Sequence, residues 1–264
     1  MTAPPRILAI AGSDSSGGAG IQADIKTITM LGGYAMTAIT AVTAQNTLGV
    51  TAVEALSPAL VAAQIDACLS DIGADAVKIG MLGSPEIAHA VADRLEGLEV
   101  PVVFDPVMVA TSGALLADEA TVVAFGRLME IAVLTTPNLP ELEALTGVDC
   151  ISEAAIYAAA LVIVEDYRCA VLAKGGHGDG DRVTDKLLRA DESYVDFSDE
   201  RIDTRHTHGT GCTLSSAIAT LLGRGLPLEQ AIGEAREFVR KALLAAPGFG
   251  KGHGPMGHEA VTCR

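Results

Sequence analysis

The chain of 264 residues has no tryptophan, and only 3% of its residues are aromatic, so side chains on which nucleic-acid bases could stack are scarce. Acidic residues outnumber basic ones by 33 to 18, and the net charge of −15 opposes binding to nucleic acids and anionic lipids. No apolar run approaches the roughly 18 residues of a membrane span. We therefore expect a cytoplasmic protein with neither nucleic-acid nor membrane partners.

The five cysteines are odd in number and widely scattered, and none stands in a CxxC or Cys/His ligand pattern. The sequence therefore gives no support for a disulfide framework or a structural zinc site. Hydrophobic residues make up 49% of the chain, which is enough for a large buried core.

Short apolar runs that are each followed by a helical pattern predict a parallel sheet with crossover helices. The runs are nearly continuous rather than alternating, which is typical of strands buried on both faces. We expect strands at 7–11, 35–42, 76–79, 102–104, 132–135 and 170–173. We expect helices at 19–31, 58–72, 84–96, 117–130, 138–146, 153–166, 210–222 and 227–244.

Beyond residue 174 the pattern changes to mixed polar strands around 182–197, which predict an edge hairpin or antiparallel extension. The glycine-rich stretch 247–258 lacks periodicity, and we expect a loop there; its glycines and those at 175–180 are candidates for a lid. No linker or internal repeat interrupts the chain. The sequence predicts a single three-layer α/β domain spanning 1–264, with a mainly parallel sheet and helices on both faces.

The run HTHGTGCT at 206–213 leads from a loop into an apolar helix. The first turn of a helix has unpaired amides and the positive end of the macrodipole, and Gly209 and Gly211 would let a phosphate approach that backbone. The same field would lower the thiol pKa of Cys212 and make it a proton acceptor or nucleophile. The alternative is a small buried cysteine at a helix start, with the glycines serving only the turn.

A second glycine-rich turn, GSDSSGGAG at 12–20, opens the first helix. It lacks the Walker lysine and the dinucleotide spacing, so its glycines would instead press backbone against a flat ligand. The alternative is a tight strand-to-helix turn, with Asp24 solvated on the helix.

Polar residues follow three further strands, at the edge where ligands bind in open parallel sheets. Asp105 and Glu141 could converge on a Mg²⁺ that bridges nucleotide phosphates, and Lys174 could reach transferring phosphate oxygens. Simpler explanations exist for each: Asn138 and Glu141 have the spacing of a capping box, and the lysine could be solvated. Their joint placement with Cys212 on one rim predicts a phosphoryl-transfer site.

The chain also resembles the ribokinase-like vitamin kinases, and among them the hydroxymethylpyrimidine/phosphomethylpyrimidine kinases of thiamine biosynthesis. The matching segments occur in the family's order over nearly the whole chain: AGSDSSGGAGIQAD (11–24), TAQN (43–46), KIGM (78–81), DPVM (105–108), TPNLPE (136–141), KGGH (174–177), THGTGCT (207–213) and KGHGP (251–255). The resemblance implies a Rossmann-like ribokinase fold, MgATP, a homodimer, and phosphorylation of 4-amino-5-hydroxymethyl-2-methylpyrimidine and then of its monophosphate.

The resemblance also implies roles for individual residues. Gln45 would bind the polar edge of the pyrimidine, since an amide both donates and accepts hydrogen bonds. The remaining implied assignments are substrate contacts by Ala19, Asp24, Thr43, Met81 and Val107, catalysis by Lys174, Gly209, Gly211 and Cys212, and metal binding by Asp105 and Glu141 with Asn138 behind them. The residues before His208 depart from the family pattern, so His206 receives no role.

Two other functions remain open. Some pyridoxal kinases on the same scaffold also have a cysteine at the position of Cys212, although Gln45 and Met81 favour a pyrimidine. The second alternative is a ligand-binding sensor that kept the fold and lost catalysis. The presence of all four candidate catalytic and metal-binding side chains argues against it: Asp105, Glu141, Lys174 and Cys212.

Overall fold

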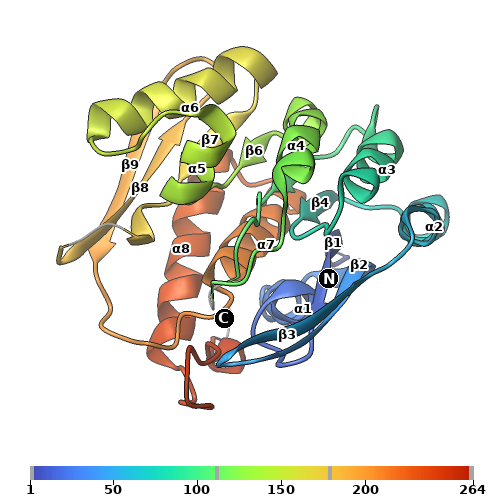
Figure 1. Ribbon diagram of the computed structural model, residues 1–264, viewed down its shortest axis with the longest axis horizontal. Coiled ribbons are helices and arrows are strands. Elements are labelled where there is room, and N and C mark those ends of the chain that lie inside the picture. The colour runs from blue at the N-terminus through green and yellow to red at the C-terminus, as the bar shows by residue number, and fades with distance from the viewer. Residues whose placement is uncertain (1–2, 111–112, 178–179, 262–264) are drawn as a thin grey trace.

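The computed structural model describes residues 3–110, 113–177 and 180–261 (Figure 1). These residues form a nine-stranded sheet in the order β3-β2-β1-β4-β5-β6-β7-β8-β9, in which β3, β8 and β9 pair antiparallel and the other strands pair parallel. The strands are β1 (Arg6–Asp14), β2 (Tyr34–Asn46), β3 (Gly49–Ala55), β4 (Ala76–Ile79), β5 (Val102–Phe104), β6 (Leu134–Thr135), β7 (Ala170–Ala173), β8 (Arg182–Leu188) and β9 (Tyr194–Glu200).

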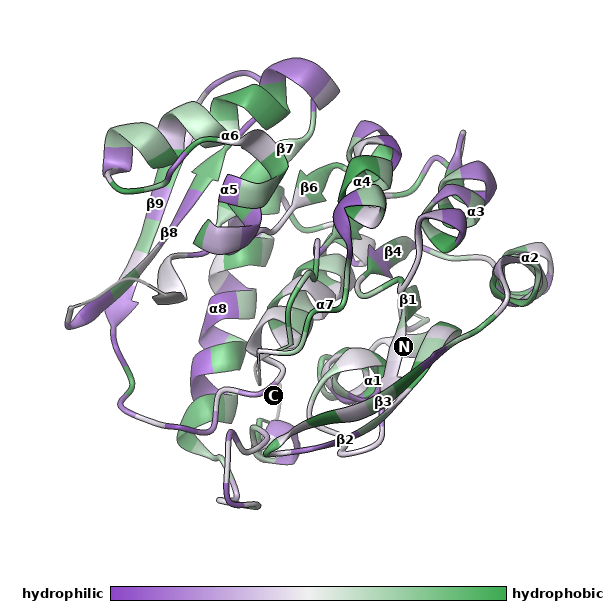
Figure 2. Ribbon diagram, viewed as in Figure 1, coloured by the Kyte–Doolittle hydropathy of each residue, from purple (hydrophilic) through white to green (hydrophobic). Residues whose placement is uncertain are grey.

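Helices cover both faces of the sheet. The α-helices are α1 (Gly20–Met30), α2 (Pro58–Asp71), α3 (Pro85–Leu95), α4 (Glu119–Ile131), α5 (Leu139–Thr146), α6 (Glu153–Tyr167), α7 (Thr210–Gly223) and α8 (Leu228–Leu244), and the 3₁₀ helices are η1 (Gly175–His177) and η2 (His258–Ala260). Side chains of α2 to α6 share one core cluster, and those of α1, α7 and α8 share the other. Figure 2 shows the corresponding pattern, with hydrophilic residues on outer turns such as those of α3.

The central strands are buried on both faces, as their continuous apolar runs predict. In β1, Leu8 and Ile10 belong to one core cluster, whereas Ile7 and Ala9 belong to the other. Successive side chains of a strand point to opposite faces, so one apolar run supplies both layers. The predicted three-layer α/β fold is confirmed.

Most predicted elements are present with small boundary shifts. The strands expected at 76–79, 102–104 and 170–173 have those bounds, and the polar segment 182–197 forms the antiparallel pair β8–β9. Within 132–135 only Leu134–Thr135 is strand. The edge strand β3 was not predicted, because it is largely exposed and has no apolar run. No helix in the described part of the chain combines the length and the apolar character needed to cross a bilayer.

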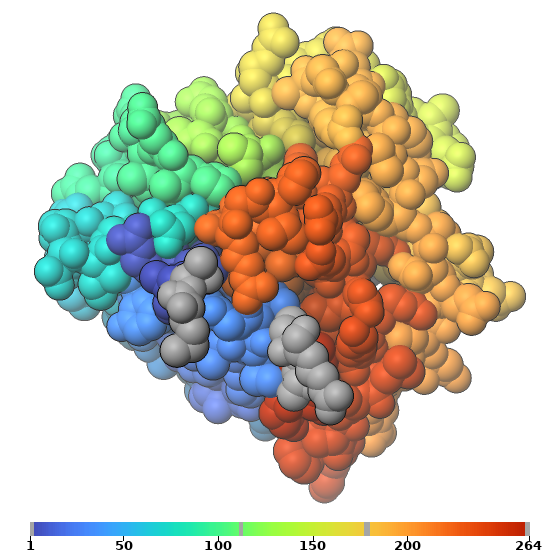
Figure 3. Space-filling model, turned by 180° about the vertical axis from the view of Figure 1, so that it is seen from behind, coloured from blue at the N-terminus to red at the C-terminus, as the bar shows by residue number. Residues whose placement is uncertain are grey.

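The order of the strands fixes where a ligand can bind. From β1 the chain moves outward to β2 and β3, and it then returns to the other side of β1 to build β4 through β9. Ligands of open α/β sheets bind beyond the carboxyl ends of the strands at such a reversal. On the same face of the sheet, α1 packs against α7, so the blue N-terminal part lies against the orange C-terminal part in Figure 3.

Candidate active site

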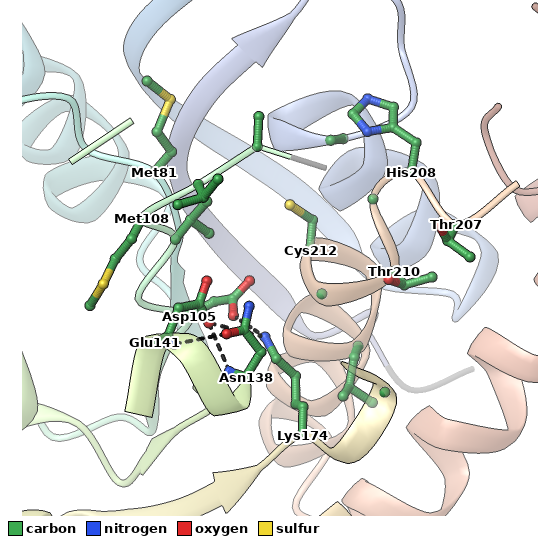
Figure 4. A pocket seen from close by; sticks show the side chains of 18 of the residues that line it. Met81, Asp105, Met108, Asn138, Glu141, Lys174, Thr207, His208, Thr210 and Cys212 are labelled. Atoms are coloured by element: carbon green, nitrogen blue, oxygen red, sulfur yellow. Dashed lines mark hydrogen bonds and ion pairs between the residues drawn. The ribbon is translucent and has the colours of Figure 1, made fainter. Parts of the chain in front are cut away.

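A cavity of about 980 Å³ lies beyond the carboxyl ends of β1, β4, β5, β6 and β7. Its volume is at the upper end of ordinary ligand pockets, which suits two ligands side by side. All the predicted site residues except Asp24 line it: Ala19, Thr43, Gln45, Met81, Asp105, Val107, Asn138, Glu141, Lys174, Gly209, Gly211 and Cys212. In Figure 4, the acidic residues, Asn138 and Lys174 gather on one side of the cavity, and Met81, Cys212 and His208 lie on the other.

The N-terminus of α7 faces the cavity without a side-chain cap. Its N-cap is Gly209 in the left-handed region (φ 84°), and the first turn holds no acidic residue that would compete with an anion. Among the described hydrogen bonds, the Thr210 amide donates to Thr207 and the Thr213 amide to Gly209, but the amides of Gly211 and Cys212 donate to no backbone acceptor. A helix start of this kind binds phosphate groups.

The two glycines of this turn are required for different reasons. A Cβ on Gly209 would lie 1.9 Å from the Gly18 carbonyl oxygen, so Gly209 allows the two glycine-rich turns to meet. A Cβ on Gly211 would lie 3.2 Å from Lys174 Nζ and 3.4 Å from Asp105 Oδ2. Gly211 therefore keeps the space between the helix start and the charged groups open.

The expected lowering of the Cys212 pKa was wrong. Burial raises the pKa of the thiol to about 11 and outweighs both the nearby Lys78 ammonium and a hydrogen bond from the Gly20 amide. A desolvated thiolate is disfavoured, because it exchanges water for an environment of lower polarity. In the free protein the thiol is therefore neutral near pH 7. The side chain still lines the cavity and has access to a ligand.

The charged side of the cavity is built from three strand ends. Lys174 Nζ lies 2.8 Å from Asp105 Oδ1 and 3.9 Å from Glu141 Oε2, and the Thr136 hydroxyl donates to Asp105 Oδ1 at 3.0 Å. Asp105 and Glu141 are both buried. The strand ends thus bring two carboxylates to one ammonium group, as the sequence predicts.

The capping box that the simpler explanation predicted is present, and Glu141 also lines the cavity. Asn138 Oδ1 accepts from the Glu141 amide and Glu141 Oε2 accepts from the Asn138 amide, each at 2.8 Å. Burial raises the pKa of Glu141 to about 7, against the opposing effect of Lys174. A cation placed beside this carboxylate would favour its ionised form.

The described residues contain no group of three acidic, histidine or cysteine side chains that could enclose a metal ion. A Mg²⁺ bound with nucleotide needs only one or two carboxylates, since phosphates and waters supply the other ligands. Among the described hydrogen bonds, Asp105 receives Thr136 and Lys174 on Oδ1, while Oδ2 points toward Gly211. The donor set therefore fits a magnesium ion shared with a nucleotide.

The opposite side of the cavity suits a flat heteroaromatic ring. The Thr43 hydroxyl donates to Gln45 Oε1 at 3.1 Å, which orients the amide so that its NH₂ group faces His208 at 3.4 Å. Met81 lies beside the glycine-rich turn, where a Cβ on Gly12 would be 2.7 Å from its sulfur. A polar edge and a thioether wall therefore stand where the resemblance places the pyrimidine.

His208 and Asp14 belong to this site but were not predicted. His208 Nε2 lies 2.8 Å from Asp14 Oδ2, and both side chains are buried. The Asp14 carboxylate also accepts from the Ser16, Gly18 and Ala19 amides, and together with the His208 contact this lowers its pKa to about 2 despite burial. An aspartate three residues before a glycine pair is a signal for such a turn, but nothing in the sequence pairs it with a histidine 194 positions away.

Asp24 must be reassigned. Its carboxylate is fully buried, lies outside the cavity wall, and bonds to Lys78 and Ser216. The alternative that Asp24 is solvated on the helix is therefore wrong. The expected contact with substrate is also not found, because the carboxylate does not reach the space where substrate would lie.

The glycine-rich stretch 247–258 is held in place at several points. The His208 amide donates to the Gly254 carbonyl, and the Gly252 amide donates to Thr47 in the β2–β3 turn. The other lid candidate is the stretch 175–180, of which Gly178 and Asp179 lie outside the described residues. Stretch 247–258 thus forms part of the wall beside His208.

Arginine residues stand at the far end of the cavity. Arg236 pairs with Asp185 and lies 2.8 Å from Asp199, and the Gly175 amide donates to Asp185 Oδ1 at 2.8 Å. These contacts fix the loop that follows Lys174. Apolar side chains of Ile202, Val239 and Leu243 line the same end, which suits an adenine ring.

Comparison with known proteins gives one consistent family. The profile of the phosphomethylpyrimidine kinase family matches residues 14–257. The hydroxymethylpyrimidine/phosphomethylpyrimidine kinase of Rhizobium meliloti is 48% identical over 255 residues, which are 95% of this chain and 96% of that protein. The thiamine biosynthesis bifunctional protein of Geobacter sulfurreducens is also 48% identical, over 96% of this chain, and the chain spans about half (52%) of its length.

A solved structure extends the comparison to the fold. An ADP complex of Bacillus subtilis pyridoxal kinase superposes with a TM-score of 0.90 at 33% identity, covering 98% of each chain. The predicted ribokinase-like fold is therefore confirmed, and the neighbouring structure belongs to a kinase that binds a nucleotide.

Proposed function

Because the chain belongs to the phosphomethylpyrimidine kinase family, we propose that it transfers the γ-phosphoryl group of ATP to 4-amino-5-hydroxymethyl-2-methylpyrimidine and then to the resulting monophosphate, in thiamine biosynthesis. It is a phosphotransferase that acts on a small molecule. One observation carries the proposal: the Cys212 thiol, the start of α7 and the Asp105–Glu141–Lys174 group line a single cavity. We take 1–264 as one kinase domain, since strands from the whole described chain share one sheet.

The pyrimidine binds between Met81 and Val107 with its polar edge toward Gln45. The amide NH₂ of Gln45 donates to a ring nitrogen, and Oε1 accepts from the exocyclic amine with the lone pair that Thr43 leaves free. The hydroxymethyl group then points toward Cys212. This orientation follows from the Gln45 amide, whose Oε1 accepts from Thr43. If the amide were turned over, its NH₂ group would face the exocyclic amine and its oxygen would face the ring nitrogen.

Phosphoryl transfer needs one proton transfer in the first reaction. The hydroxymethyl oxygen forms a bond to the γ-phosphorus, the bond from that phosphorus to the ADP oxygen breaks, and the alcohol proton passes to the Cys212 thiolate. The resulting thiol returns its proton to solvent after product leaves. The amides of Gly209, Gly211 and Cys212 and the Lys174 ammonium hold the charge on the transferring phosphoryl oxygens.

Asp105 and Glu141, with Asn138 supporting Glu141, would hold a Mg²⁺. When bound, such an ion neutralises charge on the nucleotide phosphates. Lys174 Nζ lies 2.8 Å from Asp105 Oδ1, so its ammonium would stand beside the phosphates whose charge such an ion would neutralise.

The second reaction has a different acceptor. A phosphate monoester with a second pKa of about 6 is largely dianionic near neutral pH, so it attacks without a base. A neutral thiol repels this dianion less than a carboxylate at the same place would. The neutral Cys212 of the free protein therefore suits an acceptor that is itself charged.

The direct test is product analysis by mass with hydroxymethylpyrimidine and MgATP. We expect one added phosphate early and two later. Absence of any phosphorylated pyrimidine, with ATP unconsumed, would leave a ligand-binding role instead.

Pyridoxal is the second candidate substrate, because a pyridoxal kinase superposes over nearly the whole chain. We propose pyridoxal only as a side substrate, since the cavity offers Gln45 to an aminopyrimidine edge that pyridoxal lacks. Side-by-side turnover with both compounds separates the two, and a higher kcat/KM for pyridoxal would reverse the assignment.

We also propose a homodimer. Apolar side chains of Val42, Leu48 and Val53 are exposed along the β2–β3 hairpin, at an edge of the sheet. Light scattering should give twice the chain mass of 27.0 kDa. A mass of one chain would refute the dimer without affecting the kinase assignment.

A further inference from the structure

A fully buried polar cluster lies outside the cavity wall and is not explained by substrate binding. Lys78 on β4, Asp24 on α1 and Ser216 on α7 each have no exposed surface. Lys78 Nζ contacts Asp24 Oδ1 at 2.9 Å and Oδ2 at 3.0 Å, and the Ser216 hydroxyl donates to Asp24 Oδ1 at 2.7 Å. Three elements of the fold thus meet at one buried ion pair.

The cluster lies one helical turn beyond Cys212. Ser216 follows Cys212 by four residues on α7, and Asp24 follows Gly20 by four residues on α1, so each pair shares one helix face. The Gly20 amide acts on the Cys212 sulfur, and one turn further along Ser216 bonds to Asp24. The two packed helices are therefore tied together at the buried ion pair, next to the turn that carries the thiol.

The fold reserves space for the ammonium group. A Cβ on Gly80 would lie 2.7 Å from Lys78 Nζ, so a side chain at that position would displace it. Burial lowers the pKa of Lys78, but Asp24 and the neighbouring acidic groups, Asp105 among them, together outweigh burial and the pKa is raised, so the amine stays protonated. The fold thus holds a fixed positive charge close enough to act on the Cys212 thiol.

Stability does not account for this arrangement. A buried ion pair is often no more stabilising than apolar residues of similar volume. The charges that act on Cys212 come from four elements: Lys78 from β4, Asp24 from α1, Asp105 after β5 and Lys174 after β7. Of these, Lys78 has the largest effect and favours the thiolate, whereas Asp24 and Asp105 oppose it.

We propose that Lys78 is a positioning residue for the phosphoryl transfer: its buried ammonium, held by Asp24 and Ser216 close to the sulfur, sets the fraction of Cys212 that is thiolate. The inference rests on the proposed function of Cys212 as proton acceptor. Asp24 then has two effects: its carboxylate holds the ammonium in place, and its negative charge opposes the thiolate that the ammonium favours.

The two halves of the ion pair predict opposite changes. Lys78→Met removes the positive charge and should reduce the thiolate fraction of Cys212. Asp24→Asn removes a carboxylate that opposes the thiolate and, with Asp105 still favouring the protonated amine, should increase that fraction. A unit charge at this range shifts a thiol by about one pH unit. A thiolate whose pKa is lowered is also less nucleophilic, which partly offsets the change in its fraction. The alkylation rate at pH 8 should therefore fall about threefold in Lys78→Met and rise about threefold in Asp24→Asn.

The measurement is the rate at which iodoacetamide alkylates Cys212 in the folded protein, followed by peptide mass spectrometry. Cys68 on α2 is half-buried and serves as an internal reference in the same samples. Lys186→Met is the matched control, because it removes a lysine from a different ion pair on β8 and should leave the Cys212 rate at its wild-type value. Thermal melting reports whether each variant is folded.

Opposite shifts in the two variants support the proposal. Shifts in the same direction, or none, overturn it, because a structural role would disturb Cys212 similarly whichever partner is lost. If a single variant does not fold, the double variant Lys78→Met/Asp24→Asn decides the question, since it leaves no unpaired buried charge. Its alkylation rate should lie below wild type, because the net effect of the pair favours thiolate; an equal or higher rate overturns the proposal.

The kinase assay distinguishes this inference from the function on which it rests. For hydroxymethylpyrimidine, kcat at pH 7 should move in the same direction as alkylation in each variant, while kcat for the monophosphate stays near wild type. Alkylation needs no substrate. A wild-type protein that phosphorylates nothing would therefore refute the proposed function and still leave the alkylation result to decide the role of Lys78.

Discussion

The first phosphorylation should depend on pH and on the Cys212 thiol as a base, whereas the second should need no base and should not vary with pH above about pH 7. In the free protein, burial raises the thiol pKa to about 11, so at pH 7 only about one molecule in ten thousand carries the thiolate. At any pH below the pKa, the rate of a reaction that needs this thiolate should rise about tenfold for each unit by which the pH is increased. The monophosphate acceptor needs no base, because it is already a dianion above about pH 6.

The perturbation is Cys212→Ala, which removes the thiol and keeps the backbone amide that faces the phosphate. Loss of a general base lowers the rate by about 10²–10⁴-fold. We expect a loss in this range for hydroxymethylpyrimidine and a loss within about threefold for the monophosphate, for which the thiol offers only a neutral surface. The variant should also lose the rise with pH in the first reaction.

The assay is kcat/KM for each acceptor from pH 6 to pH 9, with coupled detection of ADP and the products checked by mass. Wild type should give a slope near one for the alcohol on a logarithmic plot and a flat line for the monophosphate above pH 7. Equal losses for the two acceptors in Cys212→Ala, or parallel pH profiles in wild type, would refute the division of labour between them.

Individual contacts lead to further predictions. Gly211→Ala should lower kcat at least about tenfold with little change in melting temperature, because the new Cβ would lie 3.2 Å from Lys174 Nζ. Gly209→Ala should instead lower the melting temperature, because φ is 84° at this residue and the new Cβ would meet the Gly18 carbonyl. Gln45→Ala should raise KM for the pyrimidine about tenfold and leave KM for ATP unchanged, through the loss of hydrogen bonds to its polar edge; equal changes in both would contradict the assigned orientation. Burial lowers the pKa of His258 to about 4, below its unfolded value of about 6.5, so the free energy of unfolding should fall by up to about 3 kcal/mol as pH drops from 6.5 to 4; urea titrations of His258→Gln should show this part of the pH dependence removed. Cys212→Asp should retain phosphorylation of the alcohol and lose at least about tenfold on the monophosphate, because a carboxylate repels the dianion; retention of both activities would show that charge at this position does not matter.

The sequence was sufficient for the elements whose signals are local. Strands buried on both faces have apolar runs and the helices have an apolar helical pattern, so these elements were predicted close to their observed bounds. Ser57, Ser84 and Ser152 cap three of these helices, a local signal that the prediction did not use. The charged side of the cavity was predictable as well, because the carboxyl ends of parallel strands meet at one edge. Asp105 and Lys174 are 69 residues apart and still form an ion pair.

What the sequence could not give depends on partners from distant elements. Asp24 looks like a solvated helix residue until Lys78, 54 positions away, is placed against it. The pKa of Cys212 was misjudged because the helix start is visible in the sequence, whereas the burial that opposes its field is not. The edge strand β3 has no signal of its own, since its side chains are mostly exposed and its register comes from β2.

The corrected pKa changes the argument about why a cysteine stands at this position. A base that was ionised at neutral pH would serve the alcohol well, but it would also repel the phosphate that arrives for the second reaction. Burial raises the pKa of the Cys212 thiol; under the proposed mechanism the neutral thiol would admit the phosphate, and the Lys78 ammonium would keep the thiolate close enough in energy to serve the alcohol. The two opposing influences are therefore both needed, because one cavity has to accept a neutral substrate and the charged product made from it.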